Sequence, residues 1–116
     1  MFRTKQAAYK FAYMFLDKIF DEYFSHFNDN FPVMLGAMAL ASDGTSMDSA
    51  YSHDWNEFFA DEQVSTESAY SGIIRLLKEY IELGDRGEIA AIKSFLETDP
   101  RATQLWQSML EDADFG

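Results

Sequence analysis

The first part of the chain has the clearest hydrophobic pattern. Apolar side chains recur three and four residues apart between Thr4 and Phe27, and polar side chains fall on a narrow strip. This spacing predicts an amphipathic helix that Thr4 caps and that ends near Phe27, where Asn28, Asp29 and Asn30 break the pattern. An apolar arc this wide indicates a helix with neighbours on two sides.

Five more segments have helical spacing and are separated by turn residues. Pro32 suits the first turn of the second helix, and small residues of that helix, Gly36 among them, would allow close packing. Ser65 or Thr66 can cap the fourth helix. In chain order, these helices are predicted over residues 31–41, 47–60, 66–83, 87–97 and 100–110.

Two helix boundaries have their own signals. Gly84 follows the fourth helix, in a position where a left-handed residue is usual. Asp99 followed by Pro100 has the pattern of an N-cap and a first helical residue. No segment alternates cleanly between apolar and polar residues, so strands are not predicted. We therefore expect an all-α fold, a compact single domain over residues 1–116 with five or six helices and short loops.

The composition is that of a folded protein. Of the 116 residues, 47% are hydrophobic and 16% are aromatic, which excludes a disordered acidic tail. The chain has no cysteine, which fits a reducing cytoplasm. No targeting segment is visible, and the longest uncharged stretch, residues 30–42, is too short to span a bilayer. We expect a cytoplasmic protein that does not bind membranes.

The charge pattern gives the strongest indication of function. The net charge is −11, and residues 19–74 contain ten carboxylates but no lysine or arginine. A surface of one sign repels nucleic acid and anionic lipid and attracts a basic partner. We therefore expect a basic protein partner and no nucleic acid.

Catalytic and metal-binding motifs are weak in this sequence. His53 and Glu57 lie four residues apart and could supply half of a metal site, but His26 is the only other histidine and has no matching spacing. Adjacent carboxylates, such as Asp61 and Glu62, point in different directions on a helix and do not form a glycosidase pair. We expect no catalytic residues, no metal site and no cofactor; a small metal-dependent or carboxylate enzyme is the least favoured alternative.

Three stretches of the chain carry a family resemblance. They are AAYKFAYMFLDKIFDEYF at 7–24, MLGAMALASDGTSMDSA at 34–50 and HDWNEFF at 53–59, and the region that they span, residues 7–59, is about half of the chain. Together they are similar to small helical immunity proteins of bacterial contact-dependent growth inhibition systems. Within them, the residues with the character of packing and turn positions are Leu35, Gly36, Met38, Leu40, Gly44 and Trp55.

The resemblance implies a cytoplasmic inhibitor without catalytic activity that binds and neutralises the C-terminal toxin domain delivered by a neighbouring cell, for example a basic nuclease such as an RNase. The alternative is an acidic helical adaptor that docks another protein without any toxin. We expect a monomer before the complex forms. Charge clustering, and not the family motif, suggests the contact surface: Asp43, Asp48, Asp54, Glu57, Asp61 and Glu62.

Overall fold

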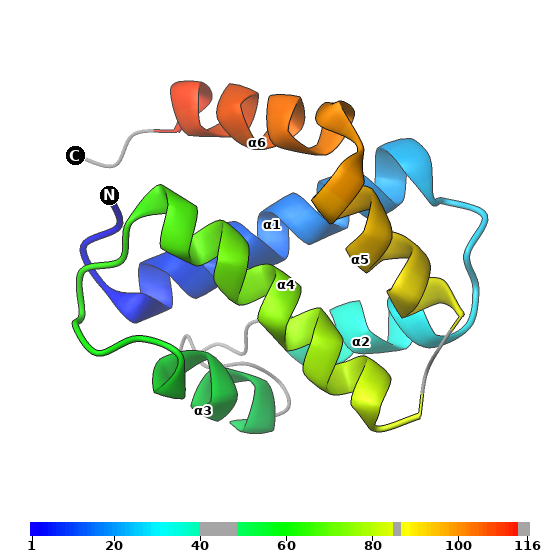
Figure 1. Ribbon diagram of the computed structural model, residues 1–116, viewed down its shortest axis with the longest axis horizontal. Coiled ribbons are helices and arrows are strands. Elements are labelled where there is room, and N and C mark those ends of the chain that lie inside the picture. Colours follow the sequence, from blue (N-terminus) through cyan, green and yellow to red (C-terminus); the bar gives the residue numbers. More distant parts are fainter. Residues whose placement is uncertain (40–48, 85–86, 114–116) are drawn as a thin grey trace.

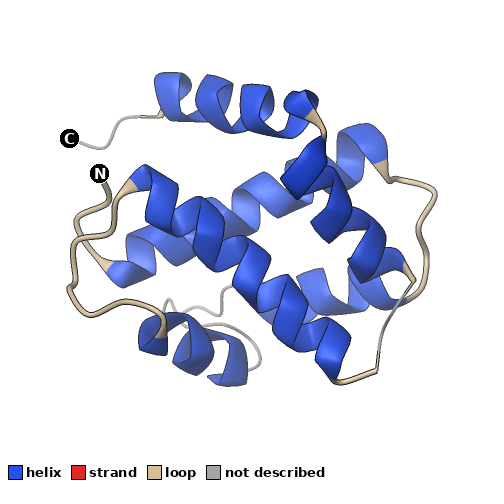
Figure 2. Ribbon diagram, viewed as in Figure 1, coloured by secondary structure: helices blue, strands red, loops and turns tan. Residues whose placement is uncertain are grey.

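Six helices make up most of the part of the chain that the computed structural model describes, which is residues 1–39, 49–84 and 87–113 (Figures 1 and 2). The all-α fold predicted from the sequence is confirmed. Within the described residues, one isolated antiparallel pairing joins Phe2 to Val64. The helices are α1 (Lys5–Tyr23), α2 (Asn30–Met38), α3 (Ser49–Glu57), α4 (Thr66–Glu82), α5 (Glu88–Thr98) and α6 (Pro100–Asp112).

Helix α1 is the centre of the fold. It contacts α2, α3, α4 and α6, and Figure 1 shows it crossing behind α4, with α6 on one side and α2 and α3 on the other. Phe15, Leu16 and Ile19 are fully buried on its inner surface. The wide apolar arc read from the sequence therefore corresponds to a helix enclosed by neighbours on several sides.

The predicted helix caps are confirmed where the structure describes them. Thr4 Oγ1 accepts the Ala7 N–H at 3.0 Å, and Asp99 Oδ1 accepts the Arg101 N–H at 2.9 Å. Of the two candidates for α4, Ser65 is the cap, because its Oγ accepts the Ser68 N–H at 3.1 Å. Gly84 follows α4 with a φ of +128°, a conformation that side-chain-bearing residues rarely adopt.

Three predicted helix ends are wrong, each by about a turn. Helix α1 ends at Tyr23 and not near Phe27, because the next residues turn and pack the Phe24 ring against Phe95 of α5 at 5.2 Å. Helix α2 ends at Met38, since Ala39 is extended. Helix α3 ends at Glu57, and the Phe59 ring beyond it packs edge-on against Trp55 at 5.0 Å. At the end of α1, a tertiary contact between aromatic rings thus competes with the helix that local spacing would extend.

The start of α2 is held by a side chain from α5. Asp29 occupies the N-cap position but makes no side-chain hydrogen bond there. Instead, the Glu88 carboxylate accepts the N–H groups of Asn28, Asp29 and Phe31 at 3.1, 3.3 and 3.0 Å. A carboxylate at a helix N-terminus also interacts favourably with the helix dipole. Glu88 therefore joins two helices that are distant in sequence.

Two polar side chains are satisfied inside the core. The fully buried Trp55 donates its Nε1–H to the Lys5 carbonyl at 2.9 Å, and the buried Tyr9 hydroxyl donates to the Met38 carbonyl at 2.9 Å. These bonds attach α1 to both α3 and the end of α2. Leu35, Met38 and Trp55, which were expected to be packing positions, are buried, and Leu40 lies outside the described residues.

Close packing at Gly36 is not found, so that prediction is wrong. Gly36 is exposed, and a Cβ built on it would have no neighbour within 4 Å. The close approach occurs at Gly72 of α4, where a Cβ would lie 2.8 Å from the Phe59 ring and 3.1 Å from Trp55. Gly72 is therefore the glycine that lets the aromatic residues of α3 and its following turn pack against α4.

Candidate functional site

Of the six predicted contact residues, two lie on α3, two lie in the connection between α3 and α4, and two lie outside the described residues. Asp54 and Glu57 lie three residues apart on α3 and are neighbours on its surface. Asp61 and Glu62 are exposed in the connection between α3 and α4. Asp43 and Asp48, like Gly44 of the family motif, lie outside the described residues.

Glu57 belongs to a solvated stretch of α3. Its carboxylate lies 3.6 Å from His53 Nε2, and the two side chains are 69% and 73% exposed. Among the described residues, no group of three or more His, Asp or Glu side chains is placed to hold a metal ion. The other histidine, His26, packs against the Phe27 ring at 4.7 Å. The structure thus pairs His53 with Glu57 but adds no further ligand to them among the described residues.

Asp54 is the predicted residue with the most suitable surroundings for binding a protein. It is half-buried and lines a small hollow of about 140 Å³ between α3 and α4. The hollow contains Tyr51 and Tyr80, whose rings stack at 6.2 Å, and Leu83, which is 85% exposed. Tyrosine provides contact area at low entropic cost, and aromatic anchors dominate protein interfaces. A carboxylate beside an accessible tyrosine pair can therefore bind a cationic, partly apolar surface.

Glu62 also has a structural role that the sequence did not reveal. Its Oε1 accepts the Lys5 N–H at 3.2 Å at the first turn of α1. The Lys5 ammonium in turn donates to the Asn56 carbonyl at 3.1 Å, at the end of α3. The fold therefore places Lys5, which lies outside residues 19–74, against the end of α3 and the connection that follows it.

Arg75 of α4 approaches the same region. Its guanidinium lies over the Phe58 ring at 4.3 Å, and its Nε is 3.8 Å from Glu79. Residues 19–74 contain no lysine or arginine, but in the folded protein Lys5 and Arg75 lie against their surface. Of the predicted contact residues that the structure describes, Asp54, Glu57 and Asp61 are the ones without a hydrogen bond to the backbone of another helix.

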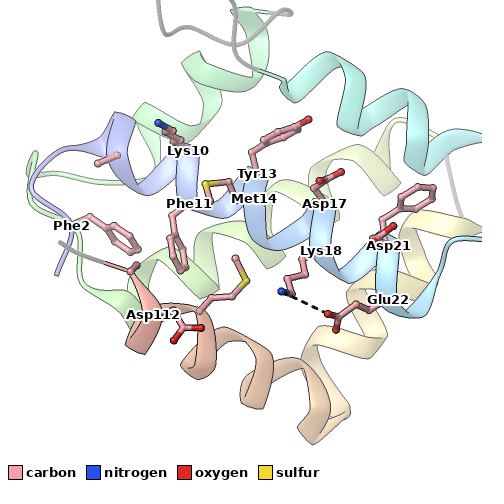
Figure 3. A pocket seen from close by; sticks show the side chains of 14 residues that line it. Phe2, Lys10, Phe11, Tyr13, Met14, Asp17, Lys18, Asp21, Glu22 and Asp112 are labelled. Atoms are coloured by element: carbon pink, nitrogen blue, oxygen red, sulfur yellow. Dashed lines mark ion pairs between the residues drawn. The ribbon is translucent and has the colours of Figure 1, made fainter.

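A second candidate site, which sequence reasoning missed, is a groove of about 820 Å³ between α1 and the end of α6 (Figure 3). Met14 lies in it, 48% exposed, with Phe11 toward α6. Phe2 and Met109 complete its apolar surface. The sequence contained one indication of this groove: Met14 is an apolar residue in the polar strip of α1, four positions after Lys10.

Charged side chains surround this groove. Asp17 and Asp21 of α1 lie along one part, and Asp112 of α6 lies near Phe2 and Phe11 (Figure 3). Burial, together with the Asp17 carboxylate, raises the pKa of Tyr13 above its usual value, so this phenol stays neutral at physiological pH. The groove thus combines an apolar floor with an acidic rim.

Comparisons of the chain with protein-family models, with curated proteins and with solved structures give no match. In the part of the chain that is described, no helix has the length and apolar character needed to cross a membrane. Fold and surface define an acidic, all-α protein with a small hollow between α3 and α4 and a groove between α1 and α6. Its function is therefore inferred from these surfaces and from the sequence.

Proposed function

We propose that this protein is a cytoplasmic immunity protein of a bacterial contact-dependent growth inhibition system. It binds the C-terminal toxin domain, a basic nuclease domain such as an RNase, and neutralises it. The resemblance in residues 7–24, 34–50 and 53–59 supports the class of protein. The observation that carries the proposal is the excess of exposed carboxylates, because it defines the chemistry of the partner.

The charge excess persists after the ion pairs are counted. The described residues contain sixteen carboxylates, of which twelve are exposed, against eight lysines and arginines. Four of these bases are taken up by local ion pairs with carboxylates two or four residues away in sequence. The surface of the described residues therefore carries a net negative charge, which attracts a cationic protein.

Neutralisation follows from the way nucleases bind their substrates. A nuclease active site is basic because it holds phosphates, and carboxylates placed there occupy the positions of the substrate backbone. Electrostatic steering can raise association rates to roughly 10⁸ M⁻¹s⁻¹ at low salt. Tight binding also needs an apolar or aromatic centre. At the α3 surface, which we define as Asp54, Glu57 and Asp61 with Tyr51 and Tyr80, both parts are available.

The test is co-expression with the C-terminal domain of the large secreted protein encoded immediately upstream of this chain's gene. Protection of the cells and a stable complex are expected. If the wild-type protein neither protects the cells nor forms a complex, this function is excluded. If a complex forms without protection, the protein is an adaptor rather than an inhibitor.

A matched pair of variants locates the contact. Glu57→Lys combined with Asp61→Lys should slow association about tenfold at low salt and reduce its salt dependence, because both carboxylates are exposed on the α3 surface. The control combines Glu82→Lys with Glu111→Lys, which changes the net charge equally on other helices. Equal slowing in both variants would mean that only the net charge, and not the α3 surface, directs binding.

A further inference from the structure

The groove between α1 and α6 contains an exposed apolar residue of α1, although this helix already buries most of its apolar side chains in the core. Most of the exposed positions on α1 are charged, yet Met14 lies among them, 48% exposed, over the apolar floor. The floor comes from segments far apart in sequence, Phe2 near one end of the chain and Met109 on α6. The Phe2 N–H and C=O both pair with Val64, which fixes the ring of Phe2 beside Phe11 at 5.3 Å. The apolar floor is thus held in place before any partner binds.

The groove has room for side chains of a partner. Its volume, about 820 Å³, falls within the range of binding pockets, about 300–1,000 Å³. Met14 and Met109 face it from two helices, and methionine adapts its shape to different apolar groups. An apolar side chain of a partner would bury the exposed part of Met14.

The charges around the groove determine which charge a bound segment of the partner should carry. Asp17, Asp21 and Asp112 have no ion pair with the described residues, whereas Lys18 is paired with Glu22 at 3.8 Å. Lys10 is the remaining base of the rim. The last turn of α6, which contains Asp112, has no basic residue, so the negative end of this helix dipole adds to the carboxylates. These features favour a positively charged occupant.

We infer that the groove binds an amphipathic helical segment of the partner protein, which inserts an apolar side chain over Met14 and places Lys or Arg near Asp17, Asp21 and Asp112. This inference rests on the proposed function, since it names the chemistry of the partner segment. It adds an apolar contact in the groove to the aromatic contact that Tyr51 and Tyr80 offer at the α3 surface.

The methionines provide a direct test with the full-length protein. A helical peptide with Leu on one face and Lys on the other is titrated into protein labelled with ¹³C at the methionine methyl groups. The Met14 and Met109 signals should shift in a saturable way, while those of Met34 and Met38, buried on α2, should not. Shifts of all four signals, or of none, would overturn the inference.

Two control peptides separate the apolar and the charged contributions. Replacing Leu by Ala in the peptide should weaken binding at least about tenfold, because the buried apolar area is lost. Replacing Lys by Glu should abolish the shift. If the Glu peptide binds as well as the Lys peptide, the partner is not basic. A Met14 shift that depends on protein concentration without any peptide would assign the groove to a second copy of this chain, which also overturns the inference.

Protein variants extend the test to the toxin complex. Met14→Ala should weaken the complex about tenfold, and the control Val33→Ala, an exposed apolar residue of α2 outside the groove, should not. If the wild type protects cells and Met14→Ala binds equally well, the groove inference fails and the function stands. If the peptide binds at Met14 but the wild type gives no protection, the groove stands and the immunity function fails.

Discussion

Replacing Glu88 by alanine tests whether one side chain of α5 holds the start of α2. The carboxylate accepts three backbone N–H groups there, at 3.0–3.3 Å. The replacement removes both carboxylate oxygens and so leaves all three N–H groups without this acceptor. Asp29, in the N-cap position, makes no side-chain hydrogen bond that could replace them.

The expected loss of stability can be estimated from the surroundings of the three donors. A hydrogen bond to a charged group contributes about 1.5–3 kcal/mol. The Phe31 N–H is partly buried, so its bond counts nearly in full, whereas those of Asn28 and Asp29 are exposed and water can replace the carboxylate. We expect Glu88→Ala to lower the free energy of unfolding by about 2–3 kcal/mol. Glu88→Gln, which keeps one acceptor oxygen, should cost about 1 kcal/mol.

Urea denaturation measures this loss. With a slope of about 2 kcal/mol/M, the midpoint of Glu88→Ala should fall by about 1–1.5 M while the slope stays constant. The control is Glu97→Ala on the same helix, where an exposed ion pair with Lys93 contributes less than about 1 kcal/mol. Hydrogen exchange at the Phe31 amide should accelerate in Glu88→Ala. Equal midpoints for Glu88→Ala and Glu97→Ala would refute the assigned role of Glu88.

Three further predictions concern the core and the titrating groups. Gly72→Ala should destabilise the protein by about 1–2 kcal/mol, because its Cβ would meet the Phe59 and Trp55 rings. Gly36→Ala, in open space, should stabilise it by about 0.5–1 kcal/mol. Urea midpoints compare the two variants, and a Gly72→Ala protein more stable than the wild type would contradict the packing. Burial raises the pKa of Tyr70 from 10.0 to about 12, so the folded state holds this proton more tightly and stability falls as the pH rises from 10 to 12. Tyr70→Phe should make that fall shallower in unfolding measurements across this range, and an unchanged slope would contradict it. Hydrogen bonds from Arg101 lower the pKa of Asp99 below its usual value of 3.8. The stabilisation of the folded state by the Asp99 carboxylate is therefore complete above pH 3.8 and is lost as the pH falls through the lower pKa of the folded state. Asp99→Asn should lack this part of the acid sensitivity, and identical acid profiles of the two proteins would count against it.

The sequence predicted the features of the fold that depend on neighbouring residues. Helical spacing located the six helices of the described residues. Thr4 and Asp99 identified two of their starts and Ser65 or Thr66 a third, because a cap acts within one turn of its own position. The positive φ of Gly84 could be predicted for the same reason. Contacts between residues distant in sequence had no such signal. Glu88 reaches back about sixty residues to α2, and nothing in its local pattern distinguishes it from other glutamates.

The candidate site was predicted only in part, because surface charge depends on how the helices pack. Residues 19–74 contain no lysine or arginine, but Lys5 and Arg75, which lie outside that window, fold against α3 and its following turn. Asp54 was identified from its charge alone, and the tyrosine pair beside it depends on the packing of α3 on α4. The groove at Met14 needs Phe2 and α6 together, so its full lining could not be read from α1.

The central position of α1 has a consequence for synthesis on the ribosome. This helix is made first, but one of its main partners, α4, begins only at Thr66. At about 5–20 residues per second, translation from Tyr23 to Thr66 takes roughly 2–9 s. During that interval the Phe15 ring lacks Tyr70 of α4 and Trp106 of α6, which pack against it in the folded protein, so nascent chains should be clients of chaperones until these helices emerge.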